Sequence, residues 1–184
     1  NYKGFDDFLE SLSSRKRKVI RKERSFIKEN NLNIKLLTGN EIKQKHWDFF
    51  YKCYLDTTGK KWGSSYLTKE FFIQIGQNFS SKILLIIALR QEQMIASALN
   101  FLSSSHLYGR LWGSTMHIPY LHFELCYYQA IEYAIKNKIK IVEAGAQGSH
   151  KLQRGYMPEK IWSLHWIKNE KFKKAISQYL DEEI

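Results

Sequence analysis

Residues 83–112 read ILLIIALRQEQMIASALNFLSSSHLYGRLW, and this stretch decides the fold. It contains three apolar runs typical of β-strands, Ile83–Leu89, Met94–Leu102 and Leu107–Trp112. Short polar segments separate the runs, so we expect an antiparallel meander. Because the first run is apolar throughout, it is expected to be a central strand with both faces buried.

Helices and further strands are expected on both sides of the meander. Apolar residues recur at helical spacing over 41–56, 67–78, 119–137 and 170–180, and Thr68 is the expected N-cap of the second of these helices. Shorter strands are expected over 34–37, 139–144 and 162–168. Since the 119–137 helix connects two strands, those strands are expected to be parallel neighbours. The predicted fold class is α/β, with a mixed, largely antiparallel central sheet of five or six strands flanked by helices.

Positive charge is concentrated near the N-terminus. The 184 residues include 29 Lys and Arg against 18 Asp and Glu, a net charge of +11. Seven basic residues and one acid lie within Arg15–Arg24. Apolar spacing predicts one or two amphipathic helices over 5–29, with a break at the serines of 11–14. We therefore expect a basic helical arm, residues 1–30, followed by the main domain, residues 31–184.

The basic helix has more than one reading, and its composition also fits a nuclear localisation signal. Arg15, Arg17 and Arg21 are candidate contacts for the phosphates of tRNA, of a nucleotide-activated donor or of acidic lipid. The alternative is a solvated helix whose charges only keep the protein soluble. Aromatic residues do not alternate with the basic ones, so this segment is not expected to stack on bases.

Composition excludes several classes of protein. The longest apolar run, Ile83–Leu89, is too short to span a bilayer, which takes about 20 residues. Two cysteines, Cys53 and Cys126, exclude a disulfide scaffold, and neither lies at zinc-finger spacing. The chain starts at Asn1 without a signal-peptide pattern, so we expect a cytoplasmic domain, cut from a longer protein, that meets an anionic partner.

The segment 141–156 gathers the most polar chemistry. Glu143 follows a predicted strand, and a loop of small residues with Gln147 leads to His150, Lys151 and Arg154. Ligands gather at the carboxyl ends of strands in open α/β sheets. Glu143 or His150 is therefore a candidate general base for an amine, and the two cations are candidates to hold a phosphate or carboxylate. The alternative is an acid–base pair that only fixes the loop.

Three further groups are candidates. In the 119–137 helix, Glu124 lies at the edge of the apolar stripe near His122, so its carboxylate must be paired in the core or functional. Tyr108, Arg110 and Trp112 alternate along one strand and are expected to share one face, as pocket lining or as packing. Trp62 lies in a polar loop, either a lid or plain surface. No spacing of His, Cys, Asp or Glu demands a metal.

Several strings carry a resemblance to a known family: Phe5–Leu9, Ser14–Arg24, His46–Asp48, Lys61–Thr68, Tyr108–Gly113, Leu121–Ile131 and Glu143–Tyr156. Together they resemble the bacterial FemAB-like predicted N-acyltransferases, often labelled peptidoglycan biosynthesis or recognition proteins. The likeness covers almost the whole chain. Members of that family are about twice as long, so the chain resembles a C-terminal half and its missing N-terminal half is an expected partner.

The resemblance implies a GNAT-like acyltransferase fold and kinship with the Fem peptidyltransferases. We therefore expect N-acyl transfer from aminoacyl-tRNA or acyl-CoA to an amine acceptor, such as a peptidoglycan precursor, with no tightly bound cofactor. Residues 113–119 lack the usual acetyl-CoA turn, which disfavours acetyl-CoA but not a longer acyl-CoA. Arg110, Lys151 and Arg154 would hold anionic groups, while His122 and Glu124 would shape the acceptor side. The alternative is a non-catalytic module that binds tRNA or a cell-wall precursor.

Overall fold

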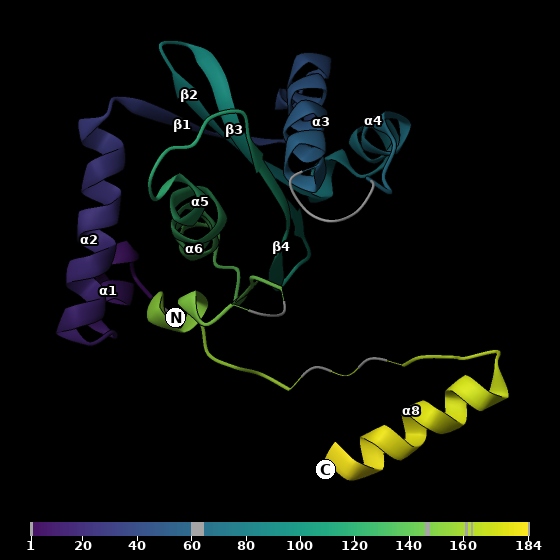
Figure 1. Cartoon of the computed structure of the whole chain (residues 1–184). Helices are drawn as coiled ribbons and strands as arrows, with labels where there is room; N and C mark the ends of the chain where they lie inside the picture. The colour runs from purple at the N-terminus through teal and green to yellow at the C-terminus, as the bar shows by residue number, and fades with distance from the viewer. Residues whose placement is uncertain (1, 60–64, 146–147, 161, 163, 184) are drawn as a thin grey trace.

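The computed structural model describes residues 2–59, 65–145, 148–160, 162 and 164–183. Its centre is a five-stranded sheet in the order β1-β2-β3-β4-β5 (Figure 1). The strands are β1 Leu32–Thr38, β2 Ile83–Arg90, β3 Gln93–Leu102, β4 His106–Ser114 and β5 Ile141–Glu143. The first three pairings are antiparallel and the pairing of β4 with β5 is parallel. The predicted meander, the mixed sheet and the parallel pair around the crossover helix are confirmed.

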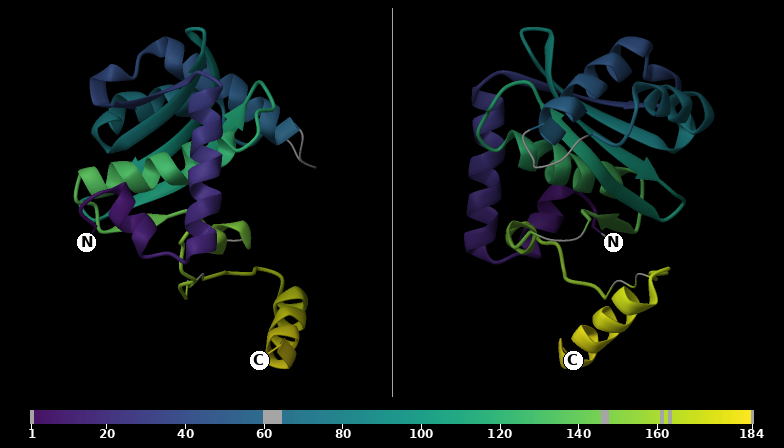
Figure 2. Two further views of the ribbon diagram at one scale, coloured as in Figure 1. Left: turned by 90° about the vertical axis from the view of Figure 1, so that its left-hand side faces the viewer. Right: turned by 45° about the vertical axis from the view of Figure 1, so that its right-hand side comes forward.

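Helices cover both faces of the sheet (Figures 1 and 2). One face carries α3 Gln44–Gly59 and α4 Lys69–Asn78, packed through Trp47, Phe50 and Phe72. The other face carries the crossover helix, which consists of α5 Leu121–Phe123, a π-helical turn Glu124–Tyr128 and α6 Gln129–Lys136. Strand β2 lies between the two layers and is buried on both faces, as its composition predicts. The Thr68 hydroxyl accepts a hydrogen bond from the Phe71 amide, which confirms the predicted N-cap of α4.

The N-terminal segment forms α1 Phe5–Glu10 and α2 Ser14–Glu29, with the break at the predicted serines. Both helices pack on the crossover helix: Phe8, Leu9 and Ile20 are buried against Tyr128 and neighbouring side chains. The division into an arm of residues 1–30 and a main domain stays a prediction. In the part of the chain that is described, no helix has the length and apolar character that a membrane span requires.

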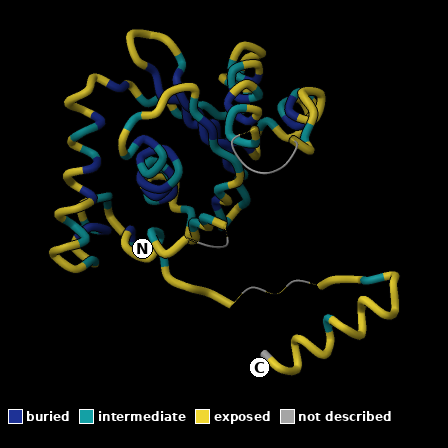
Figure 3. The backbone as a smooth tube through the Cα atoms, viewed as in Figure 1, coloured by how far each residue is buried: buried dark blue, intermediate teal, exposed yellow. Residues whose placement is uncertain are grey.

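The C-terminal segment corrects one expectation. A strand is predicted over 162–168, but the described residues of this range form none, and residues 161 and 163 lie outside the described part. The Trp162, Leu164 and Trp166 side chains are 83–101% exposed. Figure 3 shows that nearly all the described residues near the C-terminus are exposed. Among the described residues, the sheet therefore has five strands. The expected final helix is present as α8 Glu170–Glu183, with α7 His150–Gln153 preceding the extended segment.

Candidate active site

Strands β4 and β5 form a fork. They pair over three positions, ending with Tyr108 opposite Glu143. Beyond this point β4 continues from Gly109 to Ser114, and none of the described strands pairs with its outer edge there. Gly109 marks the branch point, since a Cβ atom there would lie 3.3 Å from the Glu143 carbonyl oxygen. The fork leaves backbone N–H and C=O groups of β4 available to a ligand.

A bulge in β4 separates residues that were expected together. The register against β3 shifts so that Leu99 faces Leu111 while Asn100 faces Gly109, which leaves Arg110 as an extra residue. Arg110 donates a hydrogen bond to the Tyr66 hydroxyl (3.1 Å) beside α3. Trp112 packs on the opposite face, with its ring 5.1 Å from that of His122. The prediction that Tyr108, Arg110 and Trp112 share one face is therefore wrong, because one inserted residue reverses the alternation.

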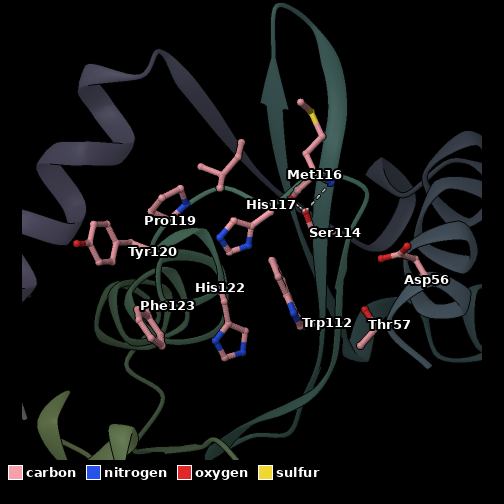
Figure 4. Close-up of a pocket in the computed structure, with 11 residues that line it drawn as sticks. Asp56, Thr57, Trp112, Ser114, Met116, His117, Pro119, Tyr120, His122 and Phe123 are labelled. Atoms are coloured by element: carbon pink, nitrogen blue, oxygen red, sulfur yellow. Dashed lines mark hydrogen bonds between the residues drawn. The ribbon is translucent and has the colours of Figure 1, made fainter. Parts of the chain in front are cut away.

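A pocket of about 600 Å³ lies at the carboxyl end of β4 (Figure 4). Its walls come from the last turn of α3, the end of β4, the loop that follows and the start of α5. The lining residues are Asp56, Thr57, Trp112, Ser114, Met116, His117, Ile118, Pro119, Tyr120, His122 and Phe123. A volume of this size is typical of small-molecule sites.

Gly113 brings α3 to this pocket. A Cβ atom at position 113 would lie 2.2 Å from the Cys53 carbonyl oxygen, so only glycine permits this contact between α3 and β4. The contact places Asp56 and Thr57, one turn after Cys53, at the pocket. Asp56, Thr57 and His117 were not predicted from the sequence. Nothing local identifies Asp56, because its relation to Trp112 arises only through the packing of the helix on the strand.

Aromatic rings surround His150 on the crossover side. The imidazole Nε2 of His150 lies 2.9 Å from the Tyr127 hydroxyl oxygen. The ring centres of His122 and His150 are 6.3 Å apart. The structure therefore brings together the two histidines selected from sequence. Burial, followed by the positive charges of Arg154 and Lys151, lowers the pKa of His150. A neutral imidazole is available to accept a proton at neutral pH.

Arg154 is inside the protein. It is 4% exposed, its Nη2 lies 2.6 Å from Glu23 Oε1, and its guanidinium lies 3.4 Å from the centre of the Phe123 ring. The Tyr128 hydroxyl donates a short hydrogen bond to the same Glu23 carboxylate. Burial first, and then this carboxylate, raises the pKa of Tyr128. An anion-binding role for Arg154 stays a prediction. A bound anion would have to compete with the Glu23 carboxylate for the Arg154 guanidinium.

Glu124 is paired, as one of its two readings required. It is 3% exposed, and its Oε1 accepts hydrogen bonds from Arg24 Nη2 (3.2 Å) and Gln129 Nε2 (2.7 Å). Arg24 also reaches Glu132 at 2.7 Å. This cluster ties α2 to the start of the π-helical turn. Glu124 is not among the described residues that line the pocket.

Glu143 is at the fork and half exposed. Its Oε1 lies 3.9 Å from His106 Nε2, and its side chain is 50% exposed. Lys151 donates a hydrogen bond to the Gly145 carbonyl (2.9 Å), and burial lowers its pKa. A carboxylate where β4 and β5 diverge can reach a ligand that lies along the free edge of β4.

The other selected residues lie farther out. Arg15 and Arg21 are exposed on α2, together with Lys18 and Lys22, while the Arg17 guanidinium donates to the Leu12 carbonyl. Trp62 and Gln147 lie outside the described residues. Burial raises the pKa of the Cys126 thiol, which leaves it protonated and poorly nucleophilic. Within the described ranges, no group of three or more His, Cys, Asp or Glu could hold a metal ion.

The sequence as a whole identifies the family. Residues 1–184 match the family model for FemAB-like proteins, described as peptidoglycan biosynthesis/recognition. The chain belongs to the FemAB-like family. The expected resemblance is therefore confirmed. No curated protein matches the sequence significantly.

Solved structures show the same fold. An aminoglycoside acetyltransferase, meta-AAC0020, from an uncultured soil metagenomic sample has a TM-score of 0.53 at 12% identity, covering 78% of this chain and 99% of its own. A possible acetyltransferase from Clostridium difficile gives 0.50 at 9% identity, covering 74% and 98%. A conserved protein of unknown function from Bacteroides thetaiotaomicron gives 0.55 at 16% identity over 83% of this chain but 53% of its own. This FemAB-like chain thus has the GNAT-like fold, and spans about half the length of the Bacteroides protein.

Proposed function

We propose that this FemAB-like chain is an N-acyltransferase that moves an acyl or aminoacyl group from an activated donor to an amine. The observation that carries the proposal is the fork between β4 and β5, which opens beside the pocket at the end of β4. A donor carbonyl lying along the free edge of β4 would meet backbone N–H groups, which stabilise the oxyanion of a tetrahedral intermediate. The fold and the family support this chemistry.

The reaction needs one base and one leaving group. The acceptor nitrogen forms a bond to the donor carbonyl carbon, and the ester or thioester bond then breaks. Glu143 or the neutral His150 takes the proton from the amine, and the departing hydroxyl or thiol receives a proton. Glu143 is accessible at the fork, while Tyr127 orients His150. We assign Glu124 and Arg154 to positioning, because both are buried in ion pairs.

Aminoacyl-tRNA is the donor we favour. Tyr120 lines the pocket and packs edge-on against Phe26 of α2, with ring centres 5.5 Å apart. The pocket wall therefore touches the helix that exposes Arg15 and Arg21. A terminal nucleoside in the aromatic pocket, with its phosphates along α2, would use both features. A long acyl-CoA is the second donor, and a peptidoglycan precursor is the acceptor that the family suggests. Use of aminoacyl-tRNA would place the reaction in the cytoplasm.

The experiment follows amide formation by the full chain. Labelled aminoacyl-tRNA, acetyl-CoA and a long acyl-CoA are each incubated with a peptidoglycan precursor that bears a free amine. Transfer from aminoacyl-tRNA supports the favoured donor, and transfer from acyl-CoA alone redirects the proposal to ordinary N-acylation. Salt-sensitive binding of tRNA without transfer from any donor would instead support a non-catalytic binding module.

A further inference from the structure

One face of the fork between β4 and β5 is open to solvent. Leu107 of β4 and Val142 of β5 pack against the crossover helix. Because side chains alternate along a strand, the opposite face carries His106 and Tyr108 of β4 and Glu143 of β5. Tyr108 is 37% exposed, and the Glu143 side chain is 50% exposed. The helices that cover this side of the sheet therefore leave its β4–β5 end accessible to a ligand.

The bulge in β4 adds a guanidinium to this open face. Arg110 is exposed and donates a hydrogen bond to the Tyr66 hydroxyl (3.1 Å). None of the ion pairs formed by the described residues includes Arg110. Residues 60–64, which lie outside the described part just before Tyr66 in sequence, contain no Asp or Glu. A guanidinium has five N–H donors, so Arg110 keeps donors for a carboxylate of a ligand.

Neighbouring groups hold the exposed aromatic side chains of this face in place. The Tyr54 hydroxyl on α3 accepts a hydrogen bond from the Tyr66 amide (3.1 Å), and the two rings pack edge-on with centres 6.4 Å apart. The Tyr108 ring stacks on the His106 ring, with centres 5.5 Å apart and planes inclined by 8°. The Ser105 hydroxyl lies 2.8 Å from Nδ1 of that imidazole. Because these side chains are already fixed, a ligand loses less free energy in ordering them.

The two charged groups of this face stand at a defined spacing. Glu143 is opposite Tyr108 in the pairing of β4 with β5, and Arg110 follows two residues farther along β4. Strand geometry puts the Cα atoms of Glu143 and Arg110 roughly 8 Å apart. A ligand with an amine and a carboxylate a few bonds apart would complement both groups. The negative charge of Glu143 disfavours a doubly charged phosphate beside Arg110.

We propose that this face binds an amine acceptor that also carries a free carboxylate, with Glu143 at the amine and Arg110 at the carboxylate. The inference rests on the proposed transfer reaction and names the class of its acceptor, an amino acid or peptide rather than a plain amine. The Tyr108 ring packs against the atoms that join the two groups. Two sources have this chemistry: the α-amine of a short peptide, and the side-chain amine of a diamino acid whose own carboxylate is free.

The test compares probes with and without the carboxylate by NMR titration of the full chain. The α-amine pair is alanyl-alanine and alanyl-alanine amide. The side-chain pair is Nα-acetyl-lysine and Nα-acetyl-lysine amide. We expect the acid of at least one pair to bind about tenfold more tightly than its amide, the lower end of the usual gain for a hydrogen bond to a charged group, because Arg110 is exposed. The pair that shows the preference identifies the source of the amine.

The decisive variant is Arg110→Gln, which should abolish the preference for the acid and leave binding of the amide unchanged. Tyr66 is 65% exposed, so water replaces the lost hydrogen bond and the fold is kept, which the NMR spectrum checks directly. Arg110→Lys keeps the charge without the planar fork and should retain part of the preference. Arg90→Gln is the matched control, because Arg90 is exposed at the end of β2 in the same sheet. Glu143→Gln should weaken binding of both members of a pair, since both carry the amine.

Four outcomes would overturn the inference. These are acids that bind no more tightly than their amides in both pairs, a preference that survives Arg110→Gln, unaltered affinity in Glu143→Gln, and no saturable binding of either acid. The proposed transfer can fail separately: carboxylate-dependent binding with no amide formation from any donor would refute the enzyme but keep the acceptor site. Conversely, amide formation at equal rates on acid and amide probes, unaffected by Arg110→Gln, would keep the enzyme and refute the site.

Discussion

Single residues decide how close the elements of this protein lie. Gly113 permits the contact between α3 and β4, and Gly109 permits the approach of β5. His150 and Tyr127 lie far apart in sequence but share a hydrogen bond. Selecting Glu143 and His150 from sequence was possible because both lie in one polar loop region. Asp56 could not be selected, since a lone acid on a helix carries no local signal.

Gly113→Ala should destabilise the protein. The added Cβ would overlap the Cys53 carbonyl, and α3 would have to move away from β4. Overpacking of this kind costs about 1–3 kcal/mol of unfolding free energy. Urea denaturation of the variant and of the unaltered chain measures the change. Equal stability of Gly113→Ala and the unaltered chain would contradict the proposed packing constraint.

His150 should titrate below the usual histidine range. Its pKa is lowered by burial and by the charges of Arg154 and Lys151. Above about pH 6.5, the usual pKa of histidine in an unfolded chain, the imidazole is neutral in both states and its contribution to the unfolding free energy is fully present. As the pH falls through the lower folded pKa, the unfolded chain binds the proton more readily and this contribution is lost. NMR titration of the imidazole tests this. Lys151→Gln should raise the pKa, and an unchanged or lower value would contradict the assigned cause.

At the scale of elements, the strand order could be predicted but the fork and bulge could not. Apolar runs and short polar connections predict β2, β3 and β4 directly, since these features are local. The bulge at Arg110 depends on the register with β3, and the fork depends on where β5 ends. The predicted strand over 162–168 fails for the same reason. Alternating apolar residues are compatible with a strand, but a strand forms only where a neighbouring strand supplies backbone hydrogen bonds.

The Glu23–Arg154 pair should hold α2 against α7. Both side chains are buried, so removing one partner leaves an uncompensated charge. We expect Glu23→Gln to lower the unfolding free energy by about 3–5 kcal/mol. The double variant Glu23→Leu with Arg154→Met should recover most of that loss, because it buries no charge. Denaturation of the three proteins measures this, and a double variant as unstable as the single one would contradict it.

At the scale of the whole molecule, the C-terminal segment stands apart from the sheet and its helices (Figure 1). Its large apolar side chains are exposed, and almost all of α8 is exposed. A chain that ends at Glu159 should therefore unfold within about 0.5 kcal/mol of the full chain, as expected for residues without core contacts. It should also aggregate less, because exposed apolar surface is removed. Denaturation and light scattering test both points, and a large loss of stability would show that the segment packs on the core.

The central claim is that acyl transfer takes place at the fork between β4 and β5. The most direct measurement is the single-turnover rate of amide formation from the active donor, in the full chain and in the variants Glu143→Gln and His150→Gln. Glu70→Gln on the outer face of α4 is the matched control. Loss of a general base should slow at least one variant by about a hundredfold to ten-thousandfold, with the control unchanged. Rates equal to that of the unaltered chain in both variants would contradict the claim.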